Sequence, residues 1–247
     1  MNNCCLISRK THKVNDDVTI NIPTIGQIKY CEDKDDEQLF WEEVSLFTKV
    51  PTDMISELDY IGLDFETVSD YDLFTILFQA KKDSGAFKSV LFKDFSLFDL
   101  DARSISGRVV LVDEKGREII NEQVYNEISE IVCVIVGHEK TKKKKFGNAY
   151  AKKKRIEQDY KNKAKAVKSD GKAKHGLDML DRIIIRLVCN ANFPYDYDTI
   201  KNITIYELIM GLKQIDKDIQ VTDLMQSRLV GNDLTKIPPE QLSRYIL

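Results

Sequence analysis

The charge of this 247-residue chain is distributed unevenly, and one segment carries most of the asymmetry. Between His138 and His175, 15 Lys or Arg residues stand against 4 Asp or Glu residues, a net charge of +11. The rest of the chain carries 22 basic and 36 acidic residues, so the near-neutral total of −3 hides an acidic body. Because like charges repel one another and need solvation, we expect this basic strip to be a linker or an arm.

The basic strip divides the chain into three predicted parts. We expect an α+β domain over residues 1–137, a Lys-rich linker or arm over 138–175, and a helical domain over 176–247. Within the strip, apolar residues recur at helical spacing, which predicts a helix between Ala149 and Val167. The predicted fold class is therefore α+β, mostly helical.

The first part mixes strand and helix signals. Two short strands at 6–9 and 18–22 are expected to form a hairpin across the polar run 11–17. A second hairpin is predicted for 109–112 and Glu118–Ile120, because a strong turn signal, Asp-Glu-Lys-Gly, separates them. A helix is expected at 24–30, after Pro23, and helices with apolar faces are expected at 38–48, 51–61, 69–78 and 124–135.

The part after the strip is expected to contain only helices. Thr204 and Glu207 stand at the spacing of a capping box, which marks a helix start. The expected helices lie at 177–188, 205–212 and 221–229, with a last turn at 240–246.

The sequence contains none of the familiar catalytic or nucleotide-binding patterns. The phosphate loop GxxxxGK[ST], the dinucleotide loop GxGxxG and the nucleophile elbow GxSxG are absent, and His138-Glu139 lacks the second histidine of HExxH. Five scattered cysteines and three dispersed histidines indicate neither a disulfide frame nor a metal site. We therefore expect a protein without enzymatic activity, cofactor or metal.

A Phe-rich segment carries three carboxylates. Without a partnering base, we interpret these acids as solvated loop residues, and we expect the phenylalanines to fill the core. The acids are Asp94, Asp99 and Asp101, and the phenylalanines are Phe92, Phe95 and Phe98.

Hydrophobic residues make up 43% of the chain, enough for a substantial core, but no apolar run approaches the 18 residues of a membrane span. The N-terminus also lacks the apolar stretch of a signal peptide. We expect a soluble, intracellular protein that does not enter a membrane.

Two clusters in the basic strip could contact a polyanion, since lysines with interleaved aromatic residues can follow a phosphate backbone. Lysine dominates over arginine in the strip, 14 to 1, so any nucleic-acid binding would be non-specific. Contact with an acidic protein surface, including this chain's own, and simple solubility remain alternatives. The candidate polyanion-binding residues are Lys142, Lys143, Lys144, Lys145, Lys152, Lys153, Lys154 and Arg155.

Several short motifs occur in an order that resembles tail-region proteins of phages of low-GC Gram-positive bacteria. The C-terminal helices are similar to tail assembly chaperones, which hold the tape measure protein before the tail tube polymerises. The motifs are Asn-Ile-Pro-Thr-Ile-Gly-Gln-Ile at 21–28, Val-Pro-Thr-Asp-Met at 50–54, Val-Ser-Asp-Tyr-Asp-Leu-Phe at 68–74, Tyr-Asp-Thr-Ile at 197–200 and Ile-Thr-Ile-Tyr-Glu-Leu at 203–208.

The resemblance implies a non-enzymatic protein of phage morphogenesis with a tape measure or other tail protein as partner. It also implies a place in the host-cell cytoplasm, or in the virion if the protein is a structural tail or neck component. Non-specific nucleic-acid binding is the other alternative. The residues expected to bind the partner are Tyr206, Leu208, Ile209 and Leu212.

Overall fold

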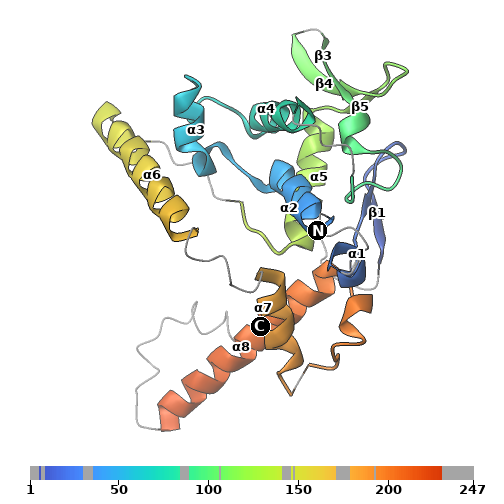
Figure 1. Ribbon diagram of the computed structural model, residues 1–247, viewed down its shortest axis with the longest axis vertical. Helices are drawn as coiled ribbons and strands as arrows, with labels where there is room; N and C mark the ends of the chain where they lie inside the picture. Colours follow the sequence, from blue (N-terminus) through green and yellow to red (C-terminus); the bar gives the residue numbers. More distant parts are fainter. Residues whose placement is uncertain are drawn as a thin grey trace.

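The computed structural model describes residues 6, 9–29, 36–83, 89–105, 107–140, 146, 148–170, 179–191 and 193–229. Helices dominate it, and two small antiparallel sheets complete it, which confirms the predicted α+β, mostly helical class (Figure 1). None of the helices within these ranges is long and apolar enough to cross a membrane.

The α-helices are α1 (Ile25–Lys29), α2 (Asp36–Thr48), α3 (Ile55–Tyr60), α4 (Asp70–Asp83), α5 (Glu122–Ile135), α6 (Ala149–Asp170), α7 (Met179–Val188) and α8 (Ile205–Leu229). Short 3-10 helices are η2 (Pro51–Asp53), η3 (Leu97–Asp99) and η4 (Ile200–Asn202). The strands are β1 (Thr11–Lys13), β2 (Thr19–Asn21), β3 (Asp101–Ile105), β4 (Arg108–Val112) and β5 (Glu118–Ile120).

Helices α2, α4 and α5 meet at an aromatic centre. The rings of Phe74 and Tyr125 lie 4.8 Å apart between centroids, and Phe47 lies 5.0 Å from Phe74. The expected core role of the Phe-rich segment is confirmed, since Phe92 and Phe98 are buried and Phe95 packs against the core.

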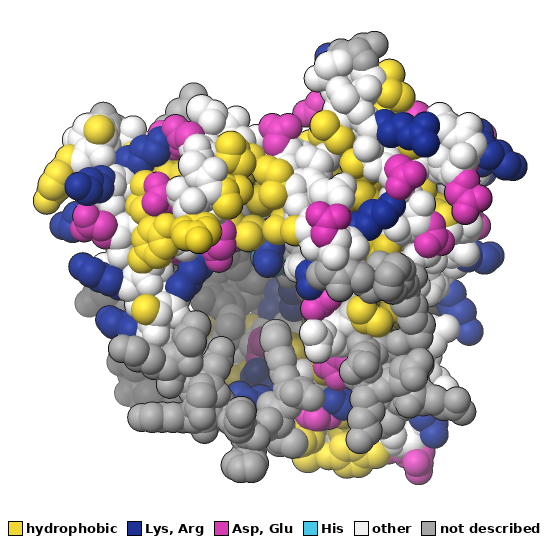
Figure 2. Space-filling model, turned by 45° about the horizontal axis from the view of Figure 1, so that its top comes forward, with side chains coloured by type: hydrophobic (Ala, Val, Ile, Leu, Met, Phe, Trp, Pro, Cys, Tyr) yellow, Lys and Arg dark blue, Asp and Glu magenta, His cyan; other side chains and the backbone are white. Residues whose placement is uncertain are grey.

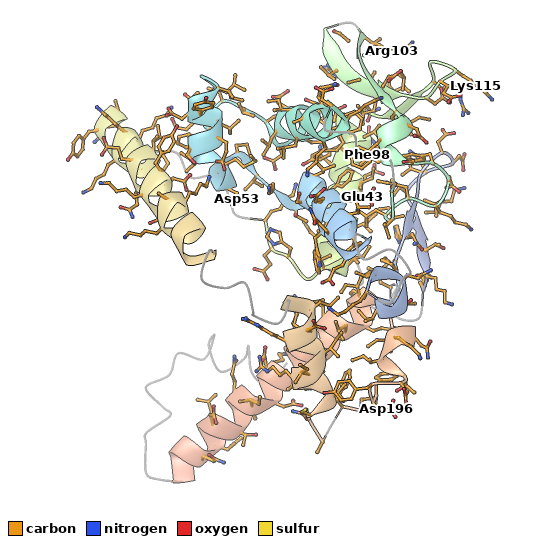
Figure 3. All side chains as sticks on the ribbon, viewed as in Figure 1. Glu43, Asp53, Phe98, Arg103, Lys115 and Asp196 are labelled. Atoms are coloured by element: carbon orange, nitrogen blue, oxygen red, sulfur yellow. The ribbon has the colours of Figure 1, made fainter. Side chains whose placement is uncertain are left out.

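A buried carboxylate, Glu43 on α2, fixes the segment that leads into this core (Figure 3). It accepts hydrogen bonds from the Ser89 hydroxyl and from the backbone N–H groups of Val90 and Leu91, at 2.6 and 3.0 Å for the last two. Burial raises the pKa of the Glu43 carboxyl above its usual value, and the three hydrogen bonds oppose that shift.

The first hairpin is tighter than the sequence predicts. Strand β1 lies within the polar run expected to be the connecting loop. The prediction of a strand at 6–9 is wrong for its described residues, Leu6 and Arg9. The turn forms around Asn15, whose side-chain oxygen accepts hydrogen bonds from the N–H groups of Asp17 and Val18. This Asx turn closes the hairpin within a few residues and leaves the polar residues before it free to pair.

The second sheet has the strand order β3-β4-β5, and the hairpin of β4 and β5 confirms the prediction. Strand β3 was not expected, and Asp101, interpreted as a loop acid, is its first residue. All five of its side chains are exposed, so no apolar alternation marks it in the sequence. Asp101 also forms an ion pair of 2.6 Å with Lys82 of α4.

A short backbone joint connects the residues just before α1 to the residues just before α8. Thr24 and Thr204 form an antiparallel bridge, with hydrogen bonds from Ile25 N–H to the Ile203 carbonyl and from Ile205 N–H to the Pro23 carbonyl. Each threonine caps the helix that follows it, α1 or α8. The joint therefore ties the start of the C-terminal helix to the N-terminal residues.

The main buried cluster extends across this joint. It contains residues from both sides of the basic strip, such as Ile28 and Ile131 on one side and Ile184, Ile203 and Ile215 on the other. The division of the chain into parts at residues 137 and 175 stays a prediction. The buried cluster itself contains residues from before and after the basic strip.

The C-terminal helix is longer than expected. Residues 205–212 and 221–229, predicted as two helices, belong to the single helix α8. The residues between them include no proline or glycine, so nothing in the backbone ends the helix there.

Candidate interaction surfaces

The predicted polyanion-binding residues have different environments. Lys142, Lys143, Lys144 and Lys145 lie outside the described residues. The ammonium group of Lys152 is already paired, at 2.5 Å from Asp64 and 3.0 Å from Glu66, and hydrogen bonding to Asp64 raises its pKa. Lys153, Lys154 and Arg155 are exposed on α6.

Helix α6 confirms the helix predicted within the strip, and one face of it is docked on α3 through polar contacts (Figure 1). Asp159 accepts hydrogen bonds from the N–H and the hydroxyl of Ser56, at 3.1 and 2.7 Å. The Tyr160 hydroxyl donates to the Ser56 carbonyl at 3.0 Å. Lys163 pairs with Asp159 at 2.9 Å and with Glu57.

Apolar packing supports this docking only locally. Ile156 of α6 and Phe146, which precedes it, pack against a small cluster formed by Ile55, Leu58, Phe65, Val68 and Leu73. Partial burial alone would raise the pKa of Asp159, but hydrogen bonds from Lys163 and Ser56 lower it below the usual value. The α3–α6 contact is therefore mainly electrostatic.

The outward face of α6 is strongly basic. Figure 2 shows Lys and Arg side chains gathered at the left edge of the molecule, over this helix. Within the described residues, no ion pair or hydrogen bond engages the five exposed cations, while Glu157 is the acidic side chain among them. These cations are Lys153, Lys154, Arg155, Lys161 and Lys165. We call them the basic face.

An open groove of about 830 Å³ lies between the β3–β4 hairpin, the start of α4 and the outer side of α5. Ile105 and Val109 of the hairpin line it and are 44% and 40% exposed. Arg108 is the one basic residue among the described residues that line it. Its acidic residues are Asp72, Glu118, Glu122, Glu127 and Glu130.

The carboxylates of this groove lack cationic partners within the described part of the chain, unlike most of the others discussed above. The Tyr71 side chain lies in the wall of this groove, close to three of these carboxylates. Burial in the groove wall, then the charges of Glu118, Glu122 and Asp72, raise the pKa of Tyr71 to about 12. No local pattern in the sequence marks this groove, because its residues come from three separate segments, around 69–72, 105–110 and 118–130.

The predicted partner-binding residues lie at the start of α8. Tyr206 and Leu208 are buried in this chain's own core, and Ile209 and Leu212 pack against it partly buried. The joint explains this placement, because it ties the start of α8 to the residues just before α1, and α8 also packs against α5. Tyr206 and Leu208 therefore present no surface to a partner in this conformation.

The distal half of α8 offers a different surface. Val221, Leu224 and Met225 share one side of the helix at i, i+3 and i+4 spacing, and Met225 is 54% exposed. Figure 1 shows this half of α8 extending away from the helices of the body. The three residues, which we call the distal triad, have the spacing of helix-in-groove anchors.

Comparison with known proteins places a match on this same region. Residues 171–240 match a family model described as the YomV second domain, which is associated with Bacillus phage SPBc2. The matched region includes α7 and α8 and covers under a third of the chain. No curated protein and no solved structure matches the chain. The comparisons thus support a phage protein.

Proposed function

We propose that this chain is a non-enzymatic protein of phage morphogenesis, a tail assembly chaperone that binds the tape measure protein. The observation that carries the proposal is the distal triad on α8, inside the region that matches a phage-associated domain. The order of short motifs similar to tail-region proteins supports it independently.

The chemistry of such binding would be helix packing. A helix that leaves the body with half-buried and exposed apolar residues along one side can pack against a helical segment of a long partner. Burial of that surface gives an affinity that depends little on salt, because the driving force is apolar rather than ionic.

The test is co-expression with the tape measure protein of the same phage, followed by capture at low and high salt. We expect capture to persist at high salt and to be lost for Met225→Asp, which places a charge in the triad. Gln226→Asp is the matched control, since it adds the same charge at an exposed neighbouring position of α8. Both variants must first show the wild-type circular dichroism spectrum.

Equal capture by wild type, Met225→Asp and Gln226→Asp would rule out the triad as the binding surface. Failure of the wild type to capture the tape measure protein would remove the chaperone role itself. Detection of the chain in purified particles by mass spectrometry would favour a structural tail component instead.

A further inference from the structure

The groove and the basic face of α6 carry opposite charges, and within the described residues neither surface forms an ion pair. We propose that the protein associates head to tail, with the basic face of one copy seated in the groove of the next. This association is separate from the proposed binding of a tape measure protein, because it uses neither α8 nor the distal triad.

The two surfaces match in length. On α6, Lys154, Lys161 and Lys165 follow one side of the helix over about 16 Å at 1.5 Å per residue. On α5, the groove carboxylates from Glu122 to Glu130 extend over about 12 Å. The line of ammonium groups on α6 and the broader acidic face of α5 therefore have comparable lengths.

The apolar residues of the groove suit the same occupant. Ile105 and Val109 can cover the aliphatic stems of lysine side chains while their ammonium groups reach the carboxylates beyond. A nucleic acid on the basic face would neutralise the cations of α6 but would leave the groove carboxylates without ion pairs. A second copy satisfies both surfaces at once.

A chain cannot place its own α6 in its own groove in this fold. Contacts with Ser56 and Glu57 hold α6 on α3, and Figure 1 shows α3 and α4 between α6 and the three-stranded sheet. The interface is therefore heterologous: each copy offers a free groove at one end and a free helix at the other. Such interfaces build rings or open filaments rather than two-fold dimers.

Two complementary variants test this geometry. The helix variant, Lys154→Gln, Lys161→Gln and Lys165→Gln, keeps the groove, and the groove variant, Glu122→Gln, Glu127→Gln and Glu130→Gln, keeps the basic face. In sedimentation velocity at low salt, we expect the wild type to form species that grow with concentration. Each variant alone should remain monomeric, while an equimolar mixture should form a dimer that grows no further.

The control variant also loses three positive charges, but at positions outside α6. Lys49→Gln, Lys93→Gln and Lys115→Gln change exposed lysines elsewhere, and this variant should associate like the wild type. Raising the salt from about 0.05 M to about 0.5 M should weaken wild-type association about tenfold or more, because exposed charge pairs are screened.

A second measurement needs no substitution. Zero-length carbodiimide cross-linking of mixed isotope-labelled and unlabelled wild type should join α6 lysines to α5 glutamates between differently labelled chains. A wild type that stays monomeric at every concentration, or a variant mixture that fails to pair, would overturn the proposal. Binding of duplex DNA by the monomeric wild type but not by the helix variant would assign the basic face to nucleic acid instead.

Discussion

Thr24 and Thr204 face each other across an antiparallel bridge, and each caps the helix that begins beside it. Thr24 exchanges hydrogen bonds with Gln27, and Thr204 does the same with Glu207, so two capping boxes stand back to back. Both belong to motifs that resemble phage tail-region proteins. Their shared role here is structural, since they join the N-terminal residues to α8.

The joint leaves no room for a side chain at Gly26. A Cβ atom there would lie 2.8 Å from the Lys201 carbonyl oxygen, which belongs to the backbone of η4. Helix propensity alone favours alanine over glycine by about 1 kcal/mol. We expect the clash to dominate, so Gly26→Ala should lower the free energy of unfolding by about 1–3 kcal/mol in urea titrations.

Gly211→Ala is the matched control for this substitution, because its Cβ would meet a ring carbon of Phe193 at 3.0 Å, and a side chain can shift more easily than backbone. We expect a smaller loss there. A gain in stability for Gly26→Ala would show that α1 and η4 are not in close contact.

Glu43→Gln should destabilise the fold by about 1–3 kcal/mol, because the amide NH2 would face donors that now meet carboxylate oxygens. Since burial raises the pKa of Glu43, the folded chain holds this proton more tightly than the unfolded chain. The contribution of Glu43 to stability should therefore fall as the pH rises above the usual value of 4.5. The difference in the free energy of unfolding between wild type and Glu43→Gln should therefore become smaller as the pH rises above 4.5.

The neighbouring Glu42 gives the opposite sign and serves as the control. Hydrogen bonds from Gln38 and Lys81 lower the pKa of Glu42, so its contribution is present above 4.5 and is lost as the pH falls through its folded value. Urea denaturation of wild type, Glu42→Gln and Glu43→Gln across this pH range measures how the free energy of unfolding changes with pH in each. If the contributions of Glu42 and Glu43 changed with pH in the same direction, the environment described for Glu43 would be contradicted.

Asp159→Ala should release α6 from α3 without unfolding the body. Asp159 accepts two hydrogen bonds from Ser56 and pairs with Lys163, and loss of such charged contacts costs about 1.5–3 kcal/mol. Amide hydrogen exchange in α6 should then become about ten- to a hundredfold faster, while exchange in α5 is unchanged. Gln158→Ala, at an exposed neighbouring position, should leave both helices at the wild-type rate.

Tyr71 links the groove wall to the second sheet. Its hydroxyl donates to the Val109 carbonyl at 2.8 Å, so Tyr71→Phe should lower stability by about 0.5–1.5 kcal/mol. Tyr60→Phe, at an 83% exposed ring, should have no effect. In a spectroscopic titration, the phenol of Tyr71 should ionise near pH 12, and Glu118→Gln should lower that value.

Local signals in the sequence account for much of the fold. The capping box at Thr204, the turn before β5 and the helical spacing in α6 each depend on neighbouring residues, and each prediction is confirmed. The Asx turn at Asn15 is also local, but it was not anticipated, and it places the first strand at Thr11–Lys13 rather than at 6–9. Strand β3 had no such signal, because its exposed residues form a strand only by pairing with β4.

The surfaces were harder to predict than the elements, because they depend on which faces the fold covers. The sequence marks Leu208 as apolar on a helix, but only the joint shows that this face belongs to the core. Likewise, the sequence shows that the strip is basic. It does not show which lysines dock α6, because Lys152 and Lys163 pair with carboxylates about a hundred residues earlier in the chain.

The joint also has a consequence for how the protein folds during synthesis. Ile25 leaves the ribosome long before Ile203, its backbone partner, and at about 5–20 residues per second the interval is on the order of 10–35 seconds. Until then, the residues before α1 lack their backbone hydrogen-bond partner, and the core lacks the apolar side chains that α7 and α8 contribute. The joint therefore pairs residues that are far apart in the sequence, and the native state forms only after most of the chain has been translated.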